Sequence, residues 1–258
     1  MLETVVIASL LGGLLSLDVL VAFQFMLSRP LVAATLTGAA LGEPGAGLCL
    51  GSVMELIWAG ALPVGSVVPP DFCVASVFAA AAAVTMRHGD PRLGWEACVA
   101  WALLWSLPLA SFAGRADIWQ RRWHSRLARA AEAGLDAGDE GALGRAVLKS
   151  AGMSFLKGAL ITGLALALLV RPMAFVLGRV FSTAAEALDW IYWLGLLLGF
   201  MVVMDLFWER KWLQAGAASF AASAIAVYAF GVEGRVVLGA ASALALGAAT
   251  ILERRARA

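Results

Sequence analysis

The first third of the chain carries four ionisable side chains inside apolar segments or at their ends, namely Asp18, Arg29, Glu55 and Asp71. An ionisable group inside a bilayer costs at least about 2.5–3.5 kcal/mol, so such groups mark functional sites by default. Carboxylates accept hydrogen bonds from hydroxyl groups and also coordinate cations. These residue types therefore predict a transporter of something polar, and they leave both a sugar and an ion open. The structural alternative is an ion pair of Arg29 with Asp18 or Glu55 that only neutralises buried charge.

Two further side chains and one segment extend this candidate site. The Gln24 amide can bridge two neighbouring hydroxyl groups, and the Trp58 indole offers an apolar face to a sugar ring. The segment 62–71, with the sequence LPVGSVVPPD, can present free backbone groups beside them. We therefore expect one shared polar pocket in the N-terminal region.

The elements that must position these side chains are apolar segments. A membrane span needs roughly 17–25 residues, and several segments in the first hundred or so residues are shorter or interrupted by proline. Such interruptions are tolerated only where protein or a water-filled cavity satisfies the freed backbone groups, and they often mark a transporter's binding site. The sequence predicts an all-α, polytopic helical membrane protein with broken or re-entrant helices in its N-terminal half. The expected segments are 4–27, 31–42, 46–62, 72–86, 94–113, 151–170, 172–188, 190–208, 212–231 and 234–252.

The composition agrees with a membrane protein. Hydrophobic residues make up 62% of the 258 residues and charged residues 14%, whereas soluble domains average about 45–50% and about 25%. The net charge of +1 gives no argument for binding nucleic acid. The three cysteines have no metal-ligand spacing, and the sequence has no Gly-rich phosphate loop and no Ser/His/Asp set. We therefore expect no metal, no cofactor and no catalytic residue in this chain.

The chain divides into an N-terminal membrane region (1–114), a hydrophilic insert (115–149) and C-terminal membrane helices (150–258). The insert is rich in arginine, so the positive-inside rule predicts that it is cytoplasmic, and the basic C-terminus is expected on the same side. Its first half has the pattern of an amphipathic helix that lies at the interface or docks on a partner. The apolar N-terminus lacks a basic region before it, and we interpret it as a retained first membrane helix.

The motifs between Phe23 and Asp71 form an ordered series without a gap. They are Gln24, Ser28-Arg29-Pro30, Gly38 with Leu41-Gly42, the block from Gly51 to Leu56, and the Leu-Pro-Val-Gly to Val-Pro-Pro-Asp run at 62–71. This series resembles the N-terminal signature of the IIC (permease) proteins in the mannose/fructose/sorbose family of the bacterial phosphoenolpyruvate-dependent sugar phosphotransferase system. The second half of the chain is similar to that family in layout only.

The resemblance implies a multi-pass protein of the bacterial inner membrane that works in a complex. A IIC subunit pairs with a IID membrane subunit, and together they bind and translocate a hexose or related sugar. A cytoplasmic IIB protein, phosphorylated by IIA, then phosphorylates the sugar, so this chain would hold no phosphoryl group itself. The resemblance also implies an oligomer of IIC–IID units.

Carried over by position, the signature assigns roles to individual residues. Glu55 and Asp71 would contact the sugar or fix the segment that does, and Gln24 and Asp18 would lie on the facing helix. Ser66 would contribute a backbone or hydroxyl contact. The expected substrate-binding residues are thus Asp18, Gln24, Glu55, Trp58, Ser66 and Asp71, with Arg29 and Pro30 bracing the helix break.

Two alternatives to a sugar permease stay open at this point. One is an ion-coupled transporter in which Asp18, Glu55 and Asp71 bind a cation; it would need no IID partner. The other is a membrane scaffold or regulator that descends from a permease and has lost transport; it would tolerate loss of Glu55.

Overall fold

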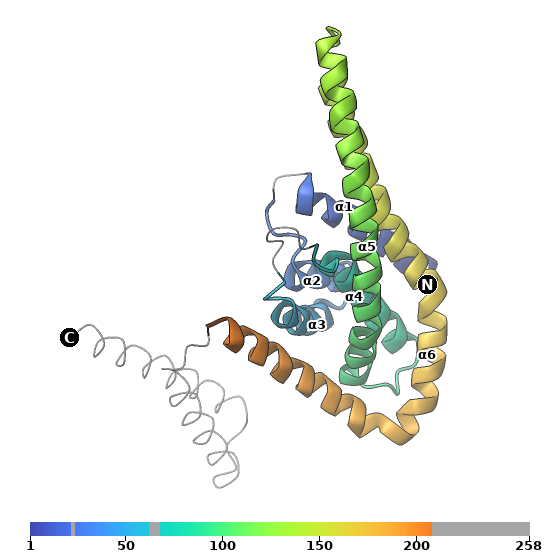
Figure 1. Cartoon of the computed structure of the whole chain (residues 1–258). Helices are drawn as coiled ribbons and strands as arrows, with labels where there is room; N and C mark the ends of the chain where they lie inside the picture. The colour runs from blue at the N-terminus through green and yellow to red at the C-terminus, as the bar shows by residue number, and fades with distance from the viewer. Residues whose placement is uncertain (22–23, 62–67, 208–258) are drawn as a thin grey trace, which may run out of the picture. The chain divides into compact units, whose positions relative to one another are not determined.

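The computed structural model describes residues 1–21, 24–61 and 68–207, and within these residues it contains six α-helices and no strand (Figure 1). The chain forms two compact units, residues 1–203 and residues 204–258. The first unit carries the candidate site. The predicted membrane segments at 212–231 and 234–252 lie outside the described residues. The predicted all-α fold is confirmed.

Helix α1 (Leu2–Leu20) packs closely against α6 through small residues. A Cβ atom added at Gly158 of α6 would collide with Ser16 Oγ and with the Gly12 carbonyl oxygen of α1. Small residues at such crossings let two helix backbones approach closely, which is typical of membrane helices. The predicted first segment, 4–27, is too long, because α1 ends at Leu20.

Helices α2 (Pro30–Ala40) and α3 (Pro44–Ile57) form a short hairpin. Each begins with proline at a first-turn position, where the missing N–H costs nothing. At 11 and 14 residues they are about 17 and 21 Å long, well short of the ~30 Å apolar core of a bilayer. Gly42 has φ of +85° and makes the turn between them. The predicted broken helices in the N-terminal half are therefore confirmed.

Helix α4 (Phe72–Gly89) is the central helix of the unit, and nearly all of its side chains from Cys73 to Val84 are buried. Its middle is a run of five alanines, Ala79–Ala83. After α4, Arg92 donates hydrogen bonds to the Asp90 carboxylate at 2.9 and 2.8 Å, which lowers the pKa of Asp90 to about 2. These bonds fix the turn that leads into α5.

Helices α5 (Trp95–Asp136) and α6 (Ala142–Phe207) are long, and the first part of α6 lies alongside α5 (Figure 1). The insert at 115–149 is the end of α5, a turn at Gly138 (φ +82°) and the start of α6. By length and hydropathy α4, α5 and the 142–180 part of α6 can each cross a membrane.

The sequence predicts separate apolar segments divided at residues 171 and 189, and these divisions are wrong. The three segments predicted at 151–170, 172–188 and 190–208 are one helix, α6, with Pro172 inside it. Trp101 of α5 donates its indole N–H to the Met173 carbonyl at 3.1 Å, so a neighbouring helix contacts α6 at this point. Pro172 frees the carbonyl four residues earlier, that of Leu168, and membrane helices tolerate this where neighbouring groups satisfy it.

Candidate functional site

The first polar contact of the candidate site joins the start of α2 to the end of α3. Arg29 donates through Nε to Glu55 Oε1 at 2.7 Å and also through Nη2 to the same oxygen. The Leu31 N–H donates to Glu55 Oε2 at 3.2 Å. A carboxylate at a helix N-terminus is favoured by the helix dipole and by the unpaired N–H groups. Glu55 therefore caps α2 across the break at Pro30, and of the two ion pairs left open by the sequence the structure forms Arg29–Glu55.

The second contact is made by Asp18 in the last turn of α1. Its Oδ1 accepts the Phe25 N–H at 2.7 Å, and its Oδ2 accepts both the N–H and the hydroxyl of Ser28 at 3.1 Å each. The backbone between these residues takes positive φ at Gln24 and Met26, a conformation that costs energy for side chains other than glycine. Buried Asp18 therefore fixes a strained connection onto α1, while the Gln24 side chain is exposed.

The third contact is a buried charge cluster of Asp71, Asp117 and Lys157. Lys157 Nζ of α6 donates to Asp71 Oδ2 at 2.8 Å and to Asp117 Oδ1 of α5. The exposed fractions of these side chains are 6% for Asp71, 17% for Asp117 and 14% for Lys157. Two carboxylates and one ammonium group leave the cluster with one excess negative charge when all are ionised. Buried charges of this kind persist only when each has a partner.

The cluster also holds the end of the 62–71 segment. Asp71 caps α4 by accepting the Val74 N–H at 3.1 Å, and its own N–H donates to the Ala110 carbonyl of α5 at 3.0 Å. At Gly114 of α5 an added Cβ would lie 3.2 Å from the Pro69 carbonyl oxygen. Residues 69–71 therefore lie against α5, and Asp71 is also paired with Lys157 of α6.

Trp58 ends α3 and differs from the carboxylates. Its indole N–H is buried, and it has no hydrogen-bond partner among the described residues. A buried donor without a partner costs about 1–3 kcal/mol. The predicted residue Ser66 lies outside the described residues.

The structure thus brings Arg29 and Glu55 into contact and links Arg29 to the start of α4, where its guanidinium lies 5.4 Å from the centre of the Phe72 ring. Asp18 reaches the same connection through Ser28. Each predicted carboxylate is held by a protein donor of its own. Within the described ranges, no three His, Cys, Asp or Glu residues lie together as metal ligands.

Sequence reasoning missed Lys157 and Asp117. Lys157 is a lone charge inside the apolar segment 151–170, so the criterion that selected Asp18 would also have selected it. Asp117 was counted with the hydrophilic insert, and no sequence signal separates it from the other charges there.

Comparison with known proteins gives a match over nearly the whole chain. The family described as the PTS system sorbose-specific IIC component matches residues 2–250. The chain is 39% identical over 54 residues to the PTS system mannose-specific EIIC component of Escherichia coli (strain K12). It is 41% identical over 61 residues to the fructose permease IIC component of Bacillus subtilis (strain 168).

These two alignments are short. They cover 21% and 24% of this chain and 20% and 23% of the relatives, so the matched stretch spans about a fifth of each relative's length. A solved structure extends the likeness to the fold. It is described as the cryoEM structure of the mannose transporter ManYZ in complex with microcin E492. Its TM-score is 0.56 at 20% identity, and the match covers 98% of this chain and 96% of the solved one.

Proposed function

This chain belongs to the sorbose-specific IIC family of the sugar phosphotransferase system, and from that premise we propose that it binds a sugar and carries it across the membrane. It is a IIC permease of the mannose family and a multi-pass protein of the inner membrane. The proposal concerns the substrate, the residues that hold it and the partners.

The observation that carries the proposal is the state of Trp58 beside Glu55. The indole N–H is buried without a partner among the described residues, one turn after a carboxylate that is only about a quarter exposed. A sugar hydroxyl can accept from that N–H while a C–H face of the ring packs on the indole, so binding would recover the cost of the unpaired donor. A cation cannot accept a hydrogen bond from that N–H.

The remaining site residues divide by how firmly the protein holds them. Asp18 and Asp71 are buried and bound by backbone and side-chain donors, so we assign them to holding the connections at 24–28 and 62–71. Glu55 and Trp58 are partly exposed and are assigned to the sugar itself. Gln24, which is exposed, and Ser66 are assigned to hydroxyl contacts once the sugar is bound.

The proposed complex follows the resemblance of residues 23–71. The chain pairs with a IID membrane subunit in an oligomer of such pairs, and a cytoplasmic IIB protein, charged by IIA, phosphorylates the emerging sugar. The α5–α6 hairpin and the C-terminus face the cytoplasm, because the arginines at 115–149 favour that side.

The test is binding of labelled sugars to the purified complex of this chain with its IID subunit. Mannose, glucose, fructose, sorbose and N-acetylated hexosamines are compared, for the wild type and for Glu55→Gln and Trp58→Phe. We expect saturable binding of one sugar that each substitution weakens by about 1–3 kcal/mol, as for a lost buried hydrogen bond.

The matched control is Glu96→Gln, since Glu96 is an exposed carboxylate in the first turn of α5, outside the site. It should leave the affinity unchanged. If the complex is stable and no sugar binds, the proposal fails, and a scaffold or an ion carrier becomes the better interpretation.

A further inference from the structure

A second polar site lies at the far end of α1 and α4. An open cavity of about 580 Å³ lies between the first turns of α1, the end of α2 and the end of α4. Pockets for small molecules measure about 300–1,000 Å³, so this one can hold a monosaccharide with water. Of the signature motifs only Leu41 lines it, and none of the expected substrate-binding residues does.

The cavity and the charge cluster of Asp71, Asp117 and Lys157 lie at opposite ends of α4. Asp71 caps the first residue of α4, whereas Thr85, His88 and Gly89 at its last turns line the cavity. A helix of 18 residues is about 27 Å long, close to the ~30 Å apolar core of a bilayer. A span by α4 would therefore place the two sites toward opposite faces of the membrane.

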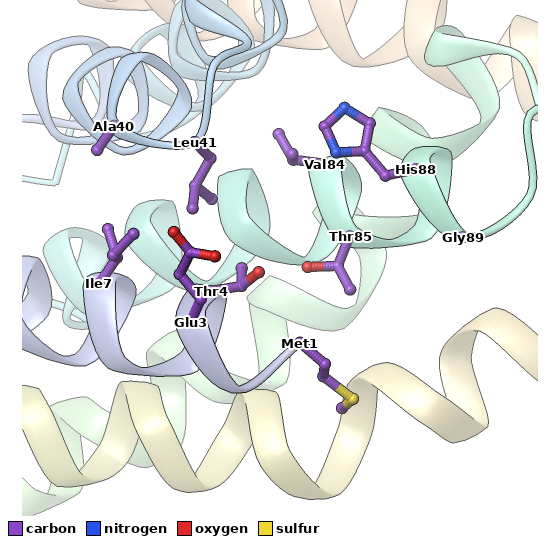
Figure 2. Close-up of a pocket in the computed structure, with 10 residues that line it drawn as sticks. All are labelled: Met1, Glu3, Thr4, Ile7, Ala40, Leu41, Val84, Thr85, His88 and Gly89. Atoms are coloured by element: carbon purple, nitrogen blue, oxygen red, sulfur yellow. The ribbon is translucent and has the colours of Figure 1, made fainter.

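The lining combines uncommitted oxygen atoms with apolar side chains. Figure 2 shows Glu3, Thr4 and Thr85 turning their oxygen atoms toward one space, with Leu41 pointing into it. The side chains of Glu3 and Thr4 have no hydrogen-bond partner among the described residues. The Thr85 hydroxyl donates to the Ala81 carbonyl at 2.6 Å, which leaves its oxygen free to accept.

This lining selects a class of ligand. Glu3 lines the cavity and repels an anion such as a sugar phosphate, whereas Glu43, which contacts the lining residue His88 at 3.1 Å, is not part of the lining. A neutral polyhydroxylated ring fits better, because its hydroxyl groups can meet Glu3, Thr4 and Thr85 while its C–H face meets Leu41.

We propose that this cavity is an outer-face binding site for the unphosphorylated sugar, occupied before the sugar reaches the site at Glu55 and Trp58. The inference rests on the proposed function. The α5–α6 hairpin leaves the bundle at the end where Asp117 contacts Lys157, so a cytoplasmic hairpin places the cavity on the outside. That is the face from which sugar arrives.

The main test is protection of an engineered cysteine in the full IIC–IID complex in sealed vesicles. The background is Cys49→Ser, since the other cysteines are buried among the described residues. Thr85→Cys is labelled with a membrane-impermeant maleimide, with and without the sugar found to bind the complex. Sugar at ten times its Kd should slow the labelling of this cysteine about tenfold. Both the labelling and the protection should be seen only when the maleimide is added at the outer face.

The control is Leu2→Cys in the same background, because Leu2 is 80% exposed and does not line the cavity. Its labelling should not respond to sugar. Equal protection of both cysteines, protection of neither, or a Thr85→Cys side chain that never reacts overturns the inference. If such a result is obtained while labelled sugar binds the same preparation, the proposed function stands and only the outer-face site is rejected. If no sugar binds, the proposed function and the outer-face site are both rejected.

A second variant does not depend on cysteine chemistry. Glu3→Gln should raise the KM for uptake about tenfold and leave kcat unchanged, as expected when a hydrogen bond to a charged group is lost before the slow step. Glu96→Gln should change neither constant. An unchanged KM for Glu3→Gln overturns the assignment of the cavity.

Discussion

The α2–α3 hairpin and the α5–α6 hairpin differ in length, in what pairs their helices and in where their polar groups lie. Helices α2 and α3 have 11 and 14 residues and pack through glycines such as Gly38 and Gly47. Helices α5 and α6 have 42 and 66 residues and are joined by polar side chains, with Gln120 donating to Ser154 and His124 contacting Ser150.

A polar residue has a different role in each of these two hairpins. Short helices leave unpaired N–H and C=O groups at membrane depth, so Glu55 and Asp18 are needed for capping whatever else they do. Inside a long helix the backbone N–H and C=O groups are already paired. A buried charge there, such as that of Lys157, therefore needs a partner from another part of the chain. Polar groups at breaks therefore serve two roles, and those inside long helices mark contacts between helices.

The largest effect should come from Lys157 in the first quarter of α6. Lys157→Met leaves Asp71 and Asp117 buried without their cation and should destabilise the chain by about 3–5 kcal/mol, measured by denaturant titration of the purified complex. Lys149→Met, at an exposed lysine of the same helix, is the control. Similar stability of the two variants would show that the cluster does not join the long helices.

The next effect should come from the crossing of α1 and α6. Gly158→Ala forces a Cβ into Ser16 and Gly12 and should cost about 1–3 kcal/mol, seen as a lower midpoint in thermal unfolding. Gly152→Ala is matched to it, because nothing lies within 4 Å of a Cβ at that position; it should be neutral or stabilising. If Gly158→Ala leaves the unfolding midpoint unchanged, α1 and α6 are not as closely packed at this crossing as the structure shows.

A smaller effect is expected at Asp18, a capping residue of the broken region. Asp18→Asn keeps one oxygen but turns an NH₂ group toward N–H donors, and each lost hydrogen bond costs about 1 kcal/mol. Faster hydrogen exchange of the Phe25 and Ser28 amides would report the loss. Asp136→Asn, at the exposed end of α5, should change neither amide, and equal exchange in both variants would contradict the capping role.

The smallest effect on stability should come from Glu55. Its pair with Arg29 is partly exposed, at 26% and 22%, and such pairs contribute about 0–1 kcal/mol. Glu55→Gln should therefore leave the unfolding midpoint almost unchanged while weakening sugar binding. Asp90→Asn, which breaks the exposed pair with Arg92, is the control for stability. If Glu55→Gln alone strongly lowers the stability, the role of Glu55 is to cap α2, and its assignment to the sugar is contradicted.

Much of the fold was predictable because its signals are local. Pro30 and Pro44 each start a helix, and Asp71 after two prolines caps the next one, as proline and N-cap preferences require. The predicted division at residue 171, just before Pro172, was wrong for the opposite reason. Whether a proline ends a membrane helix depends on its neighbours, and the contact from Trp101 comes from another part of the chain.

The site was predictable only in part. The residue types at Arg29 and Glu55 indicated a charged site, but sequence does not say which carboxylate the guanidinium reaches. Lys157 contacts Asp71 across 86 positions and Asp117 across 40. Contacts over such separations depend on how α4, α5 and α6 pack, and no local pattern encodes that packing.

The five alanines of α4 have a consequence for the entropy of folding. Alanine has no rotamers to lose, so ordering Ala79–Ala83 at the centre of the bundle costs backbone entropy only. Ordering the centre of the bundle therefore costs little side-chain entropy. The centre is also narrow, and its methyl groups cannot change conformation to make room for a larger neighbour. Widening the bundle at this level would require moving whole helices, so α4 sets the distance between the helices that surround it.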